Sequence, residues 1–204
     1  MNQPTFARLG AASGAVFAIV LFVANGDGSQ PFSGPRAIAG IAALTLAVPF
    51  MAYLCSVLRQ AEAADGWLAR AALAAGIVGI GLKLGSGAPE LAIQRAHLAA
   101  ATPLHAAIAA IADGATELSL YPLAVFCAAT AIGAFATRAL PRWLSAGAAI
   151  SAVALAVNGA FLGTDSVPAL LVFVLWTLLA SVHLLRRTWR RTAPAPRAEA
   201  VVGV

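Results

Sequence analysis

His105, Asp113 and Glu117 are residues whose types and spacing could do chemistry together. Asp113 and Glu117 lie four positions apart, and His105 precedes Asp113 by eight positions. On an uninterrupted α-helix these positions share one face, because side chains four residues apart lie one above the other. Two carboxylates and an imidazole on one stripe resemble metal ligands or an acid–base set. The same carboxylates also fit a helix start without any ligand, since negative charge is stabilising there.

Lys83 and Asn158 are polar residues near the ends of strongly apolar segments. Lys83 shares a helical face with Gly76 and Gly79, which predicts that it points toward a neighbouring helix. Its alternative is to extend to the lipid headgroups, as long basic side chains do near a helix end. Asn158 shares a face with Ser151 and is expected to face protein, because an unsatisfied amide in hydrocarbon costs several kcal/mol.

The sequence therefore predicts one candidate binding cluster, made of Lys83, Asp113, Glu117, His105 and Asn158. Two interpretations stay open for it. Ionisable groups at membrane depth suggest a functional site, whereas an ion pair of Lys83 with Glu117 or Asp113 would be purely structural.

Sequence motifs of known enzyme chemistry are absent. The chain has no GxSxG, HExxH or P-loop motif. Cys55 and Cys127 have no CxxC spacing, so we expect buried free thiols rather than a disulfide or metal site. No catalytic residue, metal or cofactor is assigned.

The elements that must position these residues are six apolar stretches. The chain has 204 residues, of which 61% are hydrophobic and 10% charged, whereas soluble domains have about 25% charged residues. A membrane span needs roughly 20 apolar residues, and stretches of that kind lie at 8–24, 37–58, 67–86, 115–136, 143–162 and 167–185. We predict an all-α membrane protein with a six-transmembrane-helix bundle over residues 1–190. Residues 191–204, basic and rich in Pro and Ala, are predicted to form a disordered cytoplasmic tail.

Residues 87–114 form the one long connection, between spans three and four. They are too polar for a seventh span and too apolar for a free loop. Pro89 with Glu90, and later Pro103, fit the first turns of helices. We predict two short extracytoplasmic helices that lie on the outer membrane face.

Basic residues orient the bundle. Placing the N-terminus inside leaves Arg36, Lys83 and Arg95 outside and the other ten of the 13 Lys and Arg residues on the cytoplasmic side. This predicts a multi-pass protein of the inner (plasma) membrane with both termini cytoplasmic. The net charge of +5 is distributed over span ends rather than over one soluble face, so no nucleic-acid partner is expected. His183, one turn before Arg186, is interpreted as an interfacial polar residue.

The sequence LPRWL at 140–144 precedes an Ala/Gly-rich span and a last span that ends in an arginine cluster. In this respect the chain resembles small six-helix bacterial integral membrane proteins of unknown function. The resemblance covers spans four to six and implies architecture only, with no site residues.

Three functional hypotheses follow. The leading one is a non-enzymatic protein that binds a small amphipathic molecule or lipid in an outward-facing polar pocket formed by the candidate cluster. The second is a membrane-embedded enzyme that uses Glu117 or Asp113 with His105. The third is an assembly or regulatory subunit that binds another membrane protein through its small-residue faces.

Overall fold

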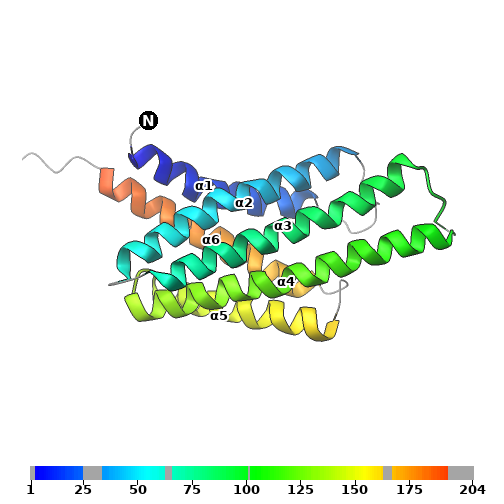
Figure 1. The fold of residues 1–204 in the computed structure, drawn as a ribbon. Coiled ribbons are helices and arrows are strands. Elements are labelled where there is room, and N and C mark those ends of the chain that lie inside the picture. Colours follow the sequence, from blue (N-terminus) through cyan, green and yellow to red (C-terminus); the bar gives the residue numbers. More distant parts are fainter. Residues whose placement is uncertain (1–2, 25–33, 63–65, 101, 163–166, 193–204) are drawn as a thin grey trace, which may run out of the picture.

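The computed structural model describes residues 3–24, 34–62, 66–100, 102–162 and 167–192, and it is a bundle of long helices (Figure 1). The helices are α1 (Gln3–Ala24), α2 (Gly34–Ala61), α3 (Trp67–Arg95), α4 (Pro103–Thr137), α5 (Arg142–Val157) and α6 (Val167–Thr192), and the π-helical segment η1 (Asn158–Leu162) continues α5. Six spans in this part are long and apolar enough to cross a membrane. The predicted all-α, six-helix membrane architecture is therefore confirmed. Of the predicted tail, Arg191 and Thr192 belong to α6, and residues 193–204 lie outside the described residues.

The structure does not show the two short helices that we predicted between spans three and four. Residues 87–95 continue α3, and residues 103–114 are the first turns of α4, so two long helices form an antiparallel hairpin. Thr102 caps α4, since its Oγ1 accepts the backbone N–H of His105 at 3.2 Å. Pro89 and Gly114 lie inside helices rather than at their ends. Proline and glycine are more frequent in membrane helices than in soluble ones, so they mark helix ends less reliably here.

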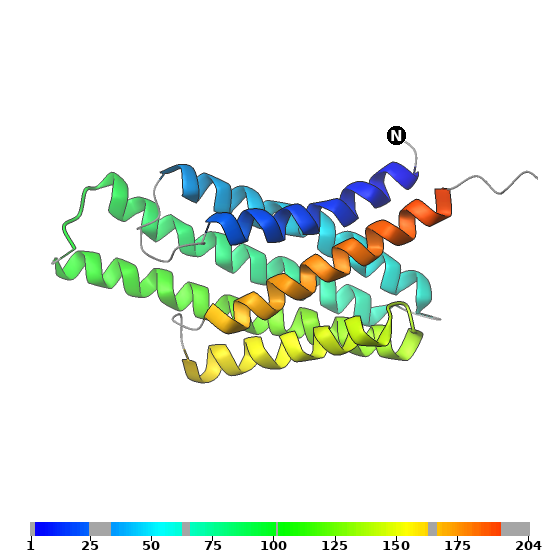
Figure 2. The ribbon, with the colours of Figure 1, turned by 180° about the vertical axis from the view of Figure 1, so that it is seen from behind.

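The bundle has two ends, which are distinguished by the segments that lie at each. The start of α1, the end of α2, the α4–α5 turn and the end of α6 lie at one end, which we call the basic end (Figures 1 and 2). The connection from α3 to α4 lies at the opposite end, which we call the hairpin end. The α3–α4 hairpin extends beyond α5 and α6 there (Figure 2).

Small residues let the helices approach closely, and aromatic side chains fill the remaining space. A Cβ on Gly79 would lie 2.7 Å from Leu123 Cγ, so α3 and α4 depend on glycine at this contact. Phe126 of α4 and Trp176 of α6 pack edge to face, with ring centroids 6.1 Å apart. Large apolar side chains such as Ile132 are exposed on the outside. Exposed apolar side chains over a whole helical surface are what a lipid-facing surface requires.

Candidate functional site: a basic pocket at the α4–α5 turn

The α4–α5 turn is built by local hydrogen bonds around a proline. Pro141 is the N-cap of α5, and its carbonyl oxygen accepts the backbone N–H groups of Leu144 at 3.0 Å and Ser145 at 3.1 Å. At the end of α4, Thr137 Oγ1 donates to the Gly133 carbonyl at 2.7 Å. The chain thus reverses direction within the four residues between Thr137 and Arg142.

Arg138 makes this reversal in a left-handed conformation, with φ 56° and ψ 27°. Glycine is the usual residue there, because a Cβ costs roughly 1–2 kcal/mol in this region. An arginine therefore occupies a position at which glycine would be less strained. Strained non-glycine positions tend to lie at functional sites.

Two hydrogen bonds fasten α6 to this turn. The Arg187 guanidinium donates to the Ala139 carbonyl at 3.1 Å. The Trp176 indole N–H donates to the Leu144 carbonyl at 3.0 Å and is buried. The first bond joins residues 48 positions apart in sequence, and the second joins residues 32 positions apart.

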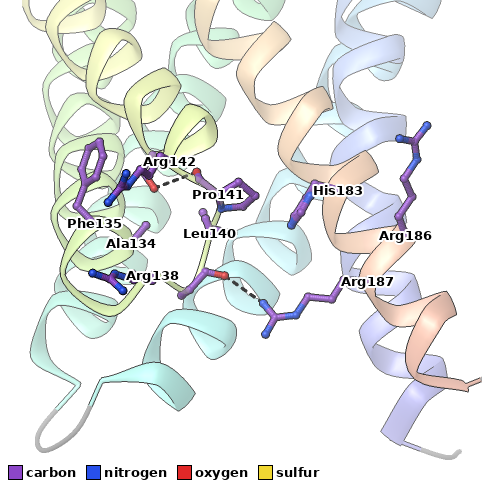
Figure 3. A pocket seen from close by; sticks show the side chains of 11 residues that line it. Ala134, Phe135, Arg138, Leu140, Pro141, Arg142, His183, Arg186 and Arg187 are labelled. Carbon is purple, nitrogen blue, oxygen red and sulfur yellow. Dashed lines mark hydrogen bonds between the residues drawn. The ribbon is translucent and has the colours of Figure 1, made fainter.

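An open pocket of about 1060 Å³ lies between the turn and α6. Figure 3 shows 11 lining residues as sticks, among which the charged groups are all basic. Arg138 and Arg142 come from the turn, and Arg187 and His183 face it from α6. Arg186 also borders the pocket, but its guanidinium points away from Arg187 and His183 (Figure 3). No carboxylate lines the pocket among the residues that the structure describes.

The electrostatics of the pocket favour an anion. Arg138 and Arg142 are exposed and Arg187 is half-buried, so their guanidinium groups are accessible to a ligand. Each guanidinium offers a planar fork of donors that matches phosphate and carboxylate oxygens. The imidazole of His183 can add one further donor. Arg138 and Arg142 extend toward Phe135 on one side of the turn, and Arg187 and His183 lie on its α6 side (Figure 3).

The sequence interpretation missed this pocket. It treated the arginines as markers of orientation and His183 as an interfacial residue. Two signals could have indicated more: Arg138 and Arg142 flank a proline-containing turn, and His183 and Arg187 lie four residues apart on one face of α6.

Lys83 of the predicted cluster lies between α3 and α4, as its glycine-rich face predicts. Its ammonium group donates to Thr116 Oγ1 at 3.0 Å. Glu90 and Asp113 interact with it electrostatically, and a direct ion pair with Asp113 or Glu117 stays a prediction. Lys83 thus belongs to a small polar cluster in the α3–α4 hairpin.

His105 does not converge with the predicted carboxylates. All three residues belong to the continuous helix α4. At 1.5 Å per residue, His105 lies about 12 Å along the axis from Asp113 and about 18 Å from Glu117. His105 Nδ1 is buried and has no hydrogen-bond partner among the described residues, whereas Asp113 is exposed. In the described residues no group of three or more His, Cys, Asp or Glu side chains could hold a metal ion.

Asn158 lies at the junction of α5 and η1, whereas Lys83 belongs to α3. Its side chain is 4% exposed, which fits the expectation that it faces protein, but its Oδ1 has no partner within the described part of the chain. The neighbouring Gly159 carbonyl accepts the Tyr121 hydroxyl at 2.9 Å and so ties η1 to α4. Of the five predicted residues, the structure therefore brings Lys83 and Asp113 into electrostatic interaction, whereas His105 lies about 12 Å from Asp113 along α4 and Asn158 is on another helix.

Comparisons with known proteins give no relative from which a role could be transferred. No protein-family model matches the chain, and neither a curated protein nor a solved structure matches it.

Proposed function

We propose that this integral membrane protein binds a phosphate-class anion in the pocket between the α4–α5 turn and α6. The observation that carries the proposal is the charge of the lining: Arg138, Arg142 and Arg187 all line the pocket, with no lining carboxylate among the described residues. Basic pockets between transmembrane helices are a known way to bind anionic lipid headgroups. The left-handed Arg138 is consistent with the proposal, although His97 after α3 has a similar φ and lines neither this pocket nor the α5–α6 groove.

The proposed orientation places this pocket at the cytoplasmic side. Its support is the concentration of arginines at the basic end, since cytoplasmic segments carry an excess of Lys and Arg. The cytoplasmic leaflet is also the one rich in anionic lipid. To test this, Ala100, which is exposed at the hairpin end, is replaced by cysteine, with Cys55 and Cys127 changed to alanine. A membrane-impermeant thiol reagent should label this variant on intact cells. Labelling only after lysis would show that the hairpin end faces the cytoplasm and that the proposed orientation is wrong.

The binding proposal is tested with the variant Arg142→Gln. Arg142 is exposed and helps to line the pocket, and the loss of its charge should weaken retention of an anionic lipid about fivefold, since one basic residue contributes about 1 kcal/mol. Native mass spectrometry of the detergent-solubilised protein measures bound phosphatidylglycerol against phosphatidylcholine. The matched control is Arg59→Gln, which removes an exposed charge at the basic end outside the pocket lining. Equal retention of both lipids by the unchanged protein would refute the proposal.

A second candidate is the predicted outward-facing site around Lys83. It is supported by the half-buried position of Lys83 beside Thr116 and by its electrostatic interaction with Glu90 and Asp113. This cluster could orient a small amphipathic molecule at the hairpin end. Lys83→Met should then abolish binding of that molecule without changing lipid retention at the basic end. The enzyme alternative loses its geometric basis, because His105 is remote from both carboxylates along α4. The assembly-subunit alternative stays a prediction.

A further inference from the structure

An apolar groove lies between α5 and α6 beside the basic pocket. Its volume is about 150 Å³, and its lining includes Trp143, Gly147 and Ile150 of α5 and Leu175, Trp176 and Leu179 of α6. The only polar side-chain atoms among these residues are the two indole nitrogens, of Trp143 and Trp176, and the Trp176 N–H donates to the Leu144 carbonyl. The groove is therefore lined almost entirely by hydrocarbon.

The groove exists because glycine interrupts the side-chain surface of α5. A Cβ on Gly147 would lie 2.9 Å from Trp176 Cδ1, so no larger residue fits there without displacing the indole. Ile150 and Leu175 are 60% and 56% exposed and line the groove from the two helices. Surfaces of this kind hold an elongated apolar group better than a convex helix face does, because more atoms come into contact.

The same two helices line the groove and help to line the basic pocket, and lining residues of the two cavities are neighbours along both helices. On α5, Arg142 and Ser145 line the pocket, whereas Trp143 lines the groove. On α6, Leu179 of the groove precedes His183 of the pocket by one turn. The Trp143 and His183 rings meet edge to face at this junction, with centroids 6.4 Å apart. A ligand can thus have its anionic group among the arginines and an alkyl chain between α5 and α6.

We propose that the ligand of the basic pocket is a phosphate-bearing lipid and that one of its acyl chains lies in the α5–α6 groove. This inference rests on the proposed anion-binding function and adds the chemical class of the ligand. The charge of the pocket complements the lipid phosphate, and the apolar groove one turn away on α5 and α6 would take the chain. Trp143 lies where headgroup and chain meet, which is the position that tryptophan prefers in membranes. Free phosphate would use the pocket alone.

The test uses phosphatidylglycerol with a photoactivatable diazirine in one acyl chain, incorporated into nanodiscs with the full-length protein. Crosslinks should concentrate on residues 143–150 and 172–179, and Leu175→Trp should reduce them several-fold by filling the groove. The control Leu171→Trp changes a 45% exposed residue of the same helix that does not line the groove. If Leu175→Trp does not fold, Ile150→Trp with Val153→Trp as control gives the same comparison on α5.

The outcomes separate this inference from the proposed function. Crosslinks that spread evenly over all lipid-facing helices would overturn the groove assignment, while anionic-lipid retention that depends on Arg142 would still support the pocket. Equal binding of glycerol phosphate and phosphatidylglycerol would also overturn it, because the chain would then contribute nothing. Loss of any preference for anionic over zwitterionic lipid would instead refute the pocket itself.

Discussion

Replacement of Arg138 by glycine should make the protein more stable and its anion binding weaker. Arg138 has φ 56° and ψ 27°, and an L-residue with a side chain pays roughly 1–2 kcal/mol in this left-handed region. Glycine avoids that cost but loses more conformational freedom on folding, which subtracts roughly 0.5–1 kcal/mol. The net expectation is a gain of about 1 kcal/mol in the free energy of unfolding, or about a fivefold change in the unfolding equilibrium.

The same substitution removes one of the charges that line the pocket. Retention of phosphatidylglycerol should therefore fall about fivefold, as expected for one basic residue. Opposite changes in stability and binding are diagnostic, because a variant that merely damages the fold would lose both.

Stability is measured by equilibrium unfolding in mixed micelles, and binding by native mass spectrometry of the same preparation. Arg138→Gln is the matched control, since it removes the charge and keeps the backbone strain, so that binding falls while stability stays within about 0.5 kcal/mol, as for most surface substitutions. The reasoning is refuted if Arg138→Gly unfolds more easily than Arg138→Gln. It is equally refuted if Arg138→Gly binds the anionic lipid as tightly as the unchanged protein does.

Two further predictions concern packing and the Lys83 cluster. Gly14→Ala should destabilise the bundle by about 1–3 kcal/mol, because the new Cβ would clash with Ser181 and Phe50. Gly114→Ala has open space around it and should stabilise α4 by about 0.5–1 kcal/mol. Thermal unfolding of the two variants checks this, and equal shifts of their melting temperatures would contradict it. The losses of stability caused by Lys83→Met and by Thr116→Val should not be additive, since each substitution breaks the same 3.0 Å hydrogen bond. A double-mutant cycle by equilibrium unfolding should give a coupling energy of about 1 kcal/mol. A value near zero would show that the contact contributes nothing to stability.

The number and class of helices could be predicted because the length of an apolar run is a local property. Each of the six spans contains enough uncharged sequence to cross a bilayer on its own. The extents of α3 and α4 were harder to predict, because Gly85, Gly87 and Pro89 are helix-breaking in water. Lys83 facing α4 was predictable from its glycine neighbours, which mark a close helix contact.

The basic pocket could not be predicted from local pattern. Its two walls come from the α4–α5 turn and from α6, and the Ala139–Arg187 bond joins residues 48 positions apart. Each arginine alone has a sufficient explanation as a topology signal, so nothing in a short window distinguishes a pocket from simple orientation. The left-handed conformation of Arg138 is likewise a property of the folded turn.

The unequal helix lengths have a consequence for the surrounding lipid. At 1.5 Å per residue, the 35 residues of α4 extend over about 52 Å, whereas α5 with its continuation η1 extends over about 30 Å. A bilayer with a hydrocarbon core of about 30 Å matches α5 with η1 but is shorter than α4. Hydrophobic mismatch should therefore tilt α4 or thicken the bilayer beside the α3–α4 hairpin, and leave it undisturbed beside α5.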